Sequence, residues 1–318
     1  MSNSSHFLHK AWNNIDFSSL RAVIKTIVLI LVVVYSLVGM KPITASAAGT
    51  TYYVNNTVTC DDLSTDTTIT PFCHISQGAA KAKVAGDTVR VLAGTYAETV
   101  NISTFSGSAG LPITFSAAPG VIMTAGTTSA FRIFSLHYIT VDGFTVTSAV
   151  DYGIYASGNH FIFSNNHITG TPNHGIYVTD SNNITVSNNH VSTSGGNGIY
   201  LKNTSASTIS SNTSDHNNPD GIRLTTCNTV TVSDNTTFAN ANNGIAVIGT
   251  IPLPSYSNTI LHNIIYANTD SGLQFDTGSH DNSVLGNLSY HNGDHGIDNN
   301  TAPNQTIVGN TFQGNYTS

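Results

Sequence analysis

GIYVTDSNNITVSNNHVSTSGGN, residues 175–197, is followed by GIYLKNTSASTISSNTSDHNNPD at 198–220 and by GIRLTTCNTVTVSDNTTFANANN at 221–243. The three stretches have the same length and the same layout, which is the signature of a repeat protein. The first marker is a glycine followed by Ile or Leu. It recurs at Gly153, Gly175, Gly198, Gly221, Gly244, Gly272 and Gly296.

A second marker, an asparagine, keeps the same step along the chain. It recurs at Asn166, Asn189, Asn212, Asn235, Asn263, Asn287 and Asn310. Asp142 is interpreted as the equivalent residue one repeat earlier. Asparagine tolerates the left-handed backbone region, and its amide can bond the same amide one repeat away. We therefore interpret the row as a structural turn ladder.

Each repeat has the pattern of short strands. Residues 175–178 and 184–186 alternate apolar and polar side chains with a period of two, and Asn and Gly punctuate the turns between them. Short strands stacked repeat on repeat bury their apolar faces on one another. The sequence thus predicts an all-β fold, a right-handed parallel β-helix over residues 88–318, with coils of about 23 residues.

The composition narrows the classes of function. Of the 318 residues only 8% are Asp, Glu, Lys or Arg, and the formal net charge is −7. So few basic residues cannot build the positive surface that nucleic-acid binding needs, and no nucleic-acid partner is expected. A monomer is expected.

The N-terminal segment has the order of an export signal. A mostly apolar run over residues 22–40 follows Arg21, and the small-residue motif Ala45-Ser46-Ala47 follows the run. Residues 1–47 are predicted to be a signal peptide, with an uncleaved membrane anchor as the alternative. Either interpretation places the protein outside the cytoplasm, secreted or on the cell surface. Residues 48–318 carry six basic and sixteen acidic residues, a net charge of −10.

Residues 48–87 are expected to cap the first coil. Residues 75–84 are predicted to form one short helix that covers the open end of the solenoid. Outside the cytoplasm a disulfide between Cys60 and Cys73 is expected. The remaining Cys227 lies among strand residues and is interpreted as a small buried apolar residue.

This order of blocks resembles a known family. Pro71 to Ala80, then Ala85 to Val91, Gly94 to Val100 and Leu111 to Phe115 are similar to the N-terminal cap and first coil of secreted right-handed β-helix proteins of the pectate-lyase-like superfamily. The superfamily includes polysaccharide lyases, glycoside hydrolases, uronan epimerases and members without a known reaction. The resemblance implies the fold and a substrate groove on the sheet of the Gly-Ile strands; it does not determine the function.

Alternation also assigns the outward face of the Gly-Ile strands. The outward positions include Tyr155, Tyr177, Tyr200 and Arg223, with Lys202 two positions further along its strand and His174 and Asp220 just before the glycines. Lys202 and Arg223 are the only basic residues after Arg132, whereas eleven Asp follow it. The sequence therefore predicts one site on this face.

Each residue of this site has a predicted role. Tyrosine rings offer flat surfaces for sugar rings, and Lys and Arg can bind a uronate carboxylate. In β-elimination or C5 epimerisation a base removes the proton beside that carboxylate, for which Lys202 or Tyr200 is the candidate, with Arg223 neutralising charge and His174 as a second acid or base. Tyr155, Tyr177 and Asp220 are predicted to bind substrate. The alternative is a tyrosine ladder whose rings only pack on one another across the strands and bind no ligand.

Two further groups of ionisable side chains occur in the repeats. Asp270 and Asp294 share a column, with Asp276, His295 and Asp298 near them. Paired carboxylates suit a glycoside hydrolase or a Ca²⁺ site, but solvated turn residues are the simpler interpretation. His167 and His190 are interpreted as stacked turn residues because no carboxylate or cysteine follows them as a further ligand, so no metal site is predicted there.

The leading hypothesis is an exported β-helix protein that binds or modifies an acidic polysaccharide, as a lyase or C5-epimerase if it is an enzyme. The alternative is a non-catalytic glycan-binding protein of the cell surface. The further alternative is a hydrolase that uses the paired Asp residues. An excess of five residues near residues 249–256 predicts a loop that leaves the coil and borders the groove.

Overall fold

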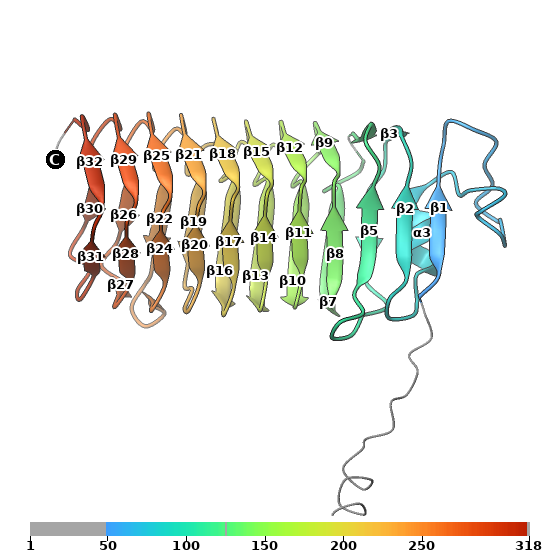
Figure 1. The fold of residues 1–318 in the computed structure, drawn as a ribbon, viewed down its shortest axis with the longest axis horizontal. Helices are drawn as coiled ribbons and strands as arrows, with labels where there is room; N and C mark the ends of the chain where they lie inside the picture. Colours follow the sequence, from blue (N-terminus) through green and yellow to red (C-terminus); the bar gives the residue numbers. More distant parts are fainter. Residues whose placement is uncertain (1–48, 125, 317–318) are drawn as a thin grey trace, which may run out of the picture. The chain divides into compact units, whose positions relative to one another are not determined.

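The computed structural model describes residues 49–124 and 126–316. The chain winds as a parallel β-solenoid, and each full coil contributes one short strand to each of three sheets (Figure 1). Consecutive coils pair in parallel, so equivalent residues lie one strand spacing apart, about 4.8 Å. The predicted fold class is confirmed.

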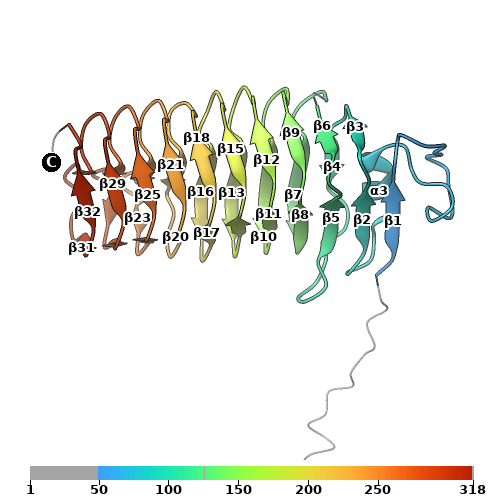
Figure 2. The same ribbon diagram turned by 45° about the horizontal axis from the view of Figure 1, so that its top comes forward.

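The three sheets run the length of the solenoid and are named here sheets A, B and C (Figure 2). In spatial order, sheet A contains β1 (Thr51–Val54), β2 (Thr88–Val91), β5 (Ile113–Ala117), β8 (Ile139–Asp142), β11 (Ile162–Ser164), β14 (Thr185–Ser187), β17 (Thr208–Ser210), β20 (Thr231–Ser233), β24 (Thr259–Leu261), β28 (Ser283–Leu285) and β31 (Thr306–Val308). Sheet B contains β3 (Gly94–Tyr96), β6 (Val121–Met123), β9 (Thr145–Thr147), β12 (His167–Thr169), β15 (His190–Ser192), β18 (Thr213–Asp215), β21 (Thr236–Phe238), β25 (Ile264–Tyr266), β29 (Leu288–Tyr290) and β32 (Thr311–Gln313). Sheet C contains β4 (Val100–Ile102), β7 (Phe131–His137), β10 (Ile154–Asn159), β13 (Ile176–Asn182), β16 (Ile199–Ser205), β19 (Ile222–Thr225), β22 (Ile245–Ile248), β26 (Leu273–Phe275) and β30 (Ile297–Asn299). A short pair, β23 (Ser255–Tyr256) and β27 (Ser279–His280), completes the set.

The core consists of stacked apolar rows. Ile176, Ile199 and Ile222 are register partners in sheet C and are fully buried. Each such side chain removes its apolar surface from water, which stabilises the fold by about 1.5–3 kcal/mol. The predicted inward positions of the Gly-Ile strands are therefore confirmed.

Asparagine ladders link the coils at the turns. The backbone N–H and the side-chain Nδ2 of Asn189 both donate to Oδ1 of Asn212, each at 2.9 Å, and Asn189 is buried. Asn166 makes the same two contacts with Asn189. Each amide thus satisfies backbone groups that would otherwise be buried without a partner. The turn ladder predicted from the sequence is confirmed.

The start of this ladder differs from the prediction. Phe144, rather than Asp142, precedes Asn166: the Phe144 N–H donates to Oδ1 of Asn166 at 3.0 Å. Asp142 pairs in register with Ser164. The ladder therefore begins at Asn166, and an apolar residue fills the equivalent place one coil earlier, where Phe144 packs on Phe131.

The N-terminal cap is built from β1, a loop and the helix α3 (Ile75–Lys81), which lies beside β1 and β2 at the end of the solenoid (Figure 1). The helix is shorter than predicted, and Val84 lies outside it and is exposed. Glu98 Oε1 and Oε2 accept the N–H groups of Ile75 and Ser76 at 2.7 and 3.0 Å, so a carboxylate satisfies the helix N-terminus.

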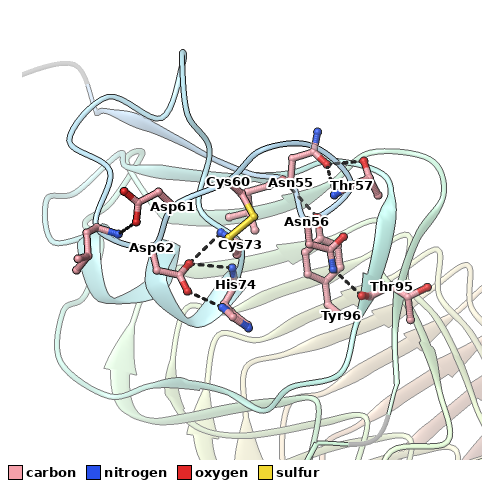
Figure 3. The surroundings of a disulfide bond; sticks show 12 residues. Asn55, Asn56, Thr57, Cys60, Asp61, Asp62, Cys73, His74, Thr95 and Tyr96 are labelled. Carbon is pink, nitrogen blue, oxygen red and sulfur yellow. Dashed lines mark hydrogen bonds and ion pairs between the residues drawn. A yellow bond between two sulfur atoms is a disulfide. The ribbon is translucent and has the colours of Figure 1, made fainter.

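The predicted disulfide between Cys60 and Cys73 is present. Figure 3 shows Asp62 beside it: Oδ1 accepts the N–H groups of Cys73 and His74, and Oδ2 lies 2.6 Å from His74 Nδ1. The hydrogen bond with Asp62 raises the pKa of His74, although burial opposes this rise. The disulfide and these contacts fix the loop against the helix.

Two remaining predictions have different outcomes. Cys227 is a buried free cysteine, as expected. The predicted signal peptide lies outside the described residues. Within residues 49–124 and 126–316, no helix has the length and apolar character needed to cross a bilayer.

Candidate functional site

The outward face of sheet C carries one in-register row of large side chains. Arg132, Tyr155, Tyr177, Tyr200 and Arg223 are successive register partners on β7, β10, β13, β16 and β19. We call these five residues the arginine–tyrosine strip. Four strand spacings separate its two arginines, roughly 19 Å.

The tyrosine rings of the strip stack on one another. The ring centroids of Tyr155 and Tyr177 are 5.1 Å apart, and those of Tyr177 and Tyr200 are 5.0 Å apart, with interplanar angles of 19° and 22°. The rings thus cover part of each other's faces. The expected flat platform for sugar rings is not the geometry found, because the solenoid's own spacing brings neighbouring rings into contact.

The hydroxyl groups of Tyr177 in the strip and of Tyr152 beside it remain protonated at neutral pH. Burial raises the pKa of Tyr177 to about 12, the neighbouring phenols add to the rise, and a hydrogen bond with Thr179 opposes it. Burial likewise raises the pKa of Tyr152, whose ring stacks on Tyr177 at 5.5 Å. These phenols therefore act as hydrogen-bond donors and acceptors rather than as phenolates.

The guanidinium group of Arg223 is held by hydrogen bonds to its own coil, one of them to a buried carboxylate. Its Nη1 donates to Oδ2 of Asp220 at 2.7 Å, and its Nε donates to Thr225 Oγ1 at 3.3 Å. The side chain of Arg223 is 26% exposed, whereas that of Asp220 is fully buried. The guanidinium is thus fixed while part of it still faces solvent.

Asp220 occupies a column in which the two neighbouring coils carry asparagine, Asn197 and Asn243. Oδ1 of Asn197 accepts the N–H of Asp220, and Oδ1 of Asp220 in turn accepts the N–H and the Nδ2 of Asn243, all at 3.1 Å. Asparagine performs this bridging without a charge. A buried carboxylate is costly unless it is paired, and Arg223 is its charged partner. Asp220 therefore lies where it can orient Arg223, not where it can touch a sugar.

His174 lies in the same column, one coil before Asn197, and is neutral at physiological pH. Its Nδ1 accepts the backbone N–H of Asn197 at 2.8 Å, and its ring packs against Tyr177 and Tyr200. Burial, with Arg223 adding to the effect, lowers the pKa of His174 to about 4. With Nδ1 accepting, Nε2 carries the proton, so the neutral ring can donate a hydrogen bond through Nε2.

Lys202 lies beside Arg223 on the same face. It pairs in register with Thr225, one strand over, so it is a diagonal neighbour of Arg223, on the order of 8 Å away by strand spacing and rise. Its side chain is exposed. Asp180 is nearby: hydrogen bonds from Asn203 and Thr179 lower the pKa of Asp180, and Lys202 adds to that lowering.

Sequence reasoning missed the N-terminal part of the strip. Arg132 is the register partner of Tyr155, and it lies 5.2 Å from the ring of Phe134, which meets Tyr155 edge to face at 4.8 Å. The coil that contains Arg132 begins with Ala130-Phe131 in place of Gly-Ile, so the repeat marker did not reveal its outward positions. The alternation of buried Phe131 and Ile133 around Arg132 was the signal available.

The acidic cluster lies in the coils that follow. The Asp294 N–H donates to the backbone oxygen of Asp270, and His295 Nδ1 is 3.1 Å from Asp294 Oδ1. Burial raises the pKa of Asp270, with Asp294 and Asp298 adding to the rise. The shared column is confirmed, and a role in hydrolysis stays a prediction.

A calcium site has little support in this region. Within the described ranges, 49–124 and 126–316, no group of three or more His, Cys, Asp or Glu side chains is arranged to hold a metal ion. Asp276 instead lines a hollow of about 410 Å³. Asn300 and residues Gly249–Ile251 of the predicted loop also line it. Ile251 at its tip is 85% exposed.

Solved structures with the same architecture include enzymes that act on polysaccharides. A rhamnogalacturonan lyase matches with a TM-score of 0.60 and 17% identity, over 77% of this chain and 75% of that one. Pectate lyase Pel9A matches with a TM-score of 0.58 and 17% identity, over 84% and 79%. A mutant of the periplasmic alginate epimerase AlgG matches with a TM-score of 0.57 and 17% identity, over 72% and 61%. At this level of identity the likeness is one of fold.

At the level of sequence, the chain is similar to YwoF, an uncharacterized protein of Bacillus subtilis (strain 168). The two are 33% identical over 118 residues, which is 31% of this chain and 25% of that protein. The chain thus spans about a quarter of the length of this curated relative. Residues 91–252 match the family described as the right handed beta helix region. That match covers about half of the chain and confirms the predicted hand of the solenoid, and the chain belongs to the right-handed β-helix family.

Proposed function

We propose that the protein binds an acidic polysaccharide along the arginine–tyrosine strip. The observation that carries the proposal is the register of the strip: two arginines bracket three stacked tyrosines on one exposed face, with Lys202 beside the second arginine. A glycan that lies along the solenoid axis meets hydroxyl donors at each coil and a cation at each end. Arg and Lys bind carboxylates through charge-assisted hydrogen bonds.

The charge distribution supports an acidic rather than a neutral glycan. Arg132, Lys202 and Arg223 are the only basic residues from position 91 onward, and all three lie on sheet C. The rest of that part of the chain carries only acidic charge. A polyanion is therefore attracted to this face and repelled by the others. Asp220 takes the role of a positioning residue for Arg223.

A second candidate function, uronate lyase or C5-epimerase activity, is favoured by the adjacency of Tyr200 and Arg223. Arg223 would neutralise the sugar carboxylate while Lys202 or Tyr200 takes the C5 proton. In elimination the C4–O bond then breaks as a C4–C5 double bond forms, and the departing oxygen takes a proton from water; in epimerisation a proton returns to the opposite face of C5. Neutral His174 contributes a donor, so its predicted role as a base does not fit the contact made by Nδ1.

The comparisons agree with a glycan partner. The similar structures include a pectate lyase, a rhamnogalacturonan lyase and an alginate epimerase. The disulfide between Cys60 and Cys73 supports an oxidising location, such as the cell surface or the medium. The similar structures support the proposal through the shared fold, and the disulfide supports it through the cellular compartment. The arginine–tyrosine strip supplies the groups that would bind the glycan.

The test is a binding titration with polygalacturonate and polymannuronate, with a neutral glucan as the control ligand. Saturable binding to a polyuronate, weakened at least tenfold in Lys202→Ala and in Arg132→Gln but unchanged in Tyr266→Phe on sheet B, is the expected result. Equal binding of the neutral glucan, or equal affinity in all three variants, would overturn the proposal. The ultraviolet absorbance of an unsaturated product identifies a lyase, and proton NMR of the polymer identifies an epimerase.

A further inference from the structure

A second group of ionisable side chains lies on the outward face of sheet B. His167 and His190 are register partners at the start of β12 and β15, and their ring centroids are 4.8 Å apart with an interplanar angle of 64°. They are strand residues, not the turn residues that the sequence predicted. Thr145 and Thr213 occupy the same row one coil to either side. The pair therefore interrupts a row of threonines.

A carboxylate fixes one ring of this pair. His190 Nε2 lies 2.6 Å from Asp215 Oδ1, and His216 Nδ1 lies 2.7 Å from Asp215 Oδ2. The side chain of Asp215 is 10% exposed and that of His190 is 43% exposed. This carboxylate could not be assigned from the repeat, because Asp215 comes from the next coil, 25 positions away.

The hydrogen bond determines which nitrogen of His190 is available. When Nε2–H donates to Asp215, the lone pair of the ring is on Nδ1. Histidines that bind metals almost always donate their other ring N–H to a carboxylate, a carbonyl or water, which sets the tautomer and makes the ligand more basic. His190 has this arrangement, and His167 places a second imidazole beside it.

We propose that His167 and His190 form a two-nitrogen binding site for one late transition-metal ion, such as Zn²⁺, Ni²⁺ or Cu²⁺, with Asp215 as the carboxylate that orients His190. Imidazole nitrogen suits these ions, whereas Ca²⁺ and Mg²⁺ select oxygen ligands. Two protein ligands leave the remaining coordination positions to water or to a ligand. The site lies on a different sheet from the arginine–tyrosine strip and does not depend on the proposed function.

The neighbouring rows supply the test variants. Threonine already fills the same row in the adjacent coils, so His167→Thr and His190→Thr copy a side chain that this strand position accommodates. His280 provides the control: its Nδ1 lies 2.7 Å from Asp281 Oδ2, and its ring stacks on Tyr256 rather than on a histidine. It is a carboxylate-bound histidine without a second imidazole.

The experiment titrates ZnCl₂ and NiCl₂ into the full chain by calorimetry and repeats the titration with each variant. We expect one saturable site that is weakened at least tenfold in His167→Thr and in His190→Thr and about tenfold in Asp215→Asn, but is unchanged in His280→Thr. His6 and His9 are present in every variant and so cancel in the comparison. Equal affinity in His190→Thr and the parent, or an equal loss in His280→Thr, would overturn the proposal.

A second measurement needs no variant and is therefore independent of folding. Long-range proton–nitrogen NMR spectra of the histidine rings are recorded while Zn²⁺ is added. The signals of His167 and His190 are expected to shift together at one equivalent, with those of His280 unchanged. Shifts spread evenly over all histidines would identify adventitious binding and contradict the assignment.

Discussion

The molecule carries two aromatic stacks, one on sheet C and one on sheet B. On sheet C, Tyr155, Tyr177 and Tyr200 stack at 5.1 and 5.0 Å. On sheet B, Phe238, Tyr266 and Tyr290 stack at 4.9 and 5.1 Å, with interplanar angles of 3° and 12°. The stacks are nearly identical in spacing, so the spacing alone does not mark a functional site.

The two stacks differ in the residues at their ends. Arg132 and Arg223 are the register partners that flank the tyrosines of sheet C. On sheet B, Asp215 and Gln313 occupy the corresponding places beside Phe238 and Tyr290. Ring stacking follows from the coil rise, whereas the charge at the ends is a property of individual residues. The end residues therefore decide which ligand each face can take.

The largest expected effect concerns the buried pair of sheet C. Arg223→Met leaves Asp220 as a buried carboxylate without a cation, and we expect a loss of about 3 kcal/mol in the free energy of unfolding. His216→Asn on sheet B is expected to cost only about 1 kcal/mol, because Asp215 keeps its contact with His190. Urea denaturation of both variants checks the difference.

A double variant separates stability from binding. Asp220→Asn/Arg223→Met places in this coil the amide that Asn197 and Asn243 carry in theirs, so most of the lost stability is expected to return. Polyuronate binding is expected to stay lost. If the double variant recovers both, Arg223 does not contact the ligand.

The next effect is a pH dependence that comes from His174. Its pKa in the folded chain is about 4, below the ordinary histidine value of 6.5, so the folded state disfavours protonation. The stability contributed by the neutral ring is fully present above pH 6.5 and is lost as the pH falls toward 4. After allowance for partial exposure, the loss is on the order of 2 kcal/mol.

His174→Asn is the matched variant, because asparagine fills the same column at Asn197 and Asn243 and accepts the same kind of backbone N–H. Unfolding free energies at pH 7 and pH 4.5 are compared. The variant is expected to lose less stability on acidification than the parent. An identical loss in both proteins would assign the acid sensitivity to other groups.

A smaller effect is expected for the salt dependence of glycan binding. Arg132→Gln removes one of the charges of the strip. Polyuronate affinity is expected to fall about tenfold at low ionic strength. The fall is expected to be smaller at high ionic strength, because salt screens exposed charges. Gln313→Ala, beside the sheet B stack, serves as the control and should leave affinity unchanged. Titrations at two salt concentrations measure both.

The smallest effect comes from one hydroxyl group. Tyr177→Phe keeps the ring stack but removes a hydrogen-bonding group, which is worth about 1 kcal/mol, or roughly fivefold in affinity. Tyr266→Phe makes the same change on sheet B and is expected to have no effect on polyuronate binding. Equal losses of polyuronate affinity in the two variants would show that sheets B and C bind the ligand alike, which would contradict the proposed difference between them.

The sequence predicted the solenoid and the row membership of Tyr155, Tyr177, Tyr200 and Arg223, because a fixed repeat converts sequence position directly into register. It also predicted the buried asparagine ladder and the disulfide. It misplaced the ladder start at Asp142 and extended the helix to Val84, since both lie where the repeat is irregular.

The contacts within the rows could not be read from the repeat. The repeat shows that Asp220 directly precedes the marker glycine of its coil. It does not show that the Asp220 carboxylate is buried and paired with Arg223. Nor does it show that the tyrosine rings cover part of each other's faces. These features depend on side-chain conformation across coils, as does the approach of Asp215 to His190.

The asparagine ladder has a mechanical consequence. From Asn166 onward, neighbouring coils are joined by parallel strand pairing and by amide contacts such as that of Asn189 with Asn212. Under tension along the axis, these repeated boundaries would open one after another, so this part of the solenoid would lengthen in discrete steps. Each freed coil of 23 residues would release roughly 75 Å of chain.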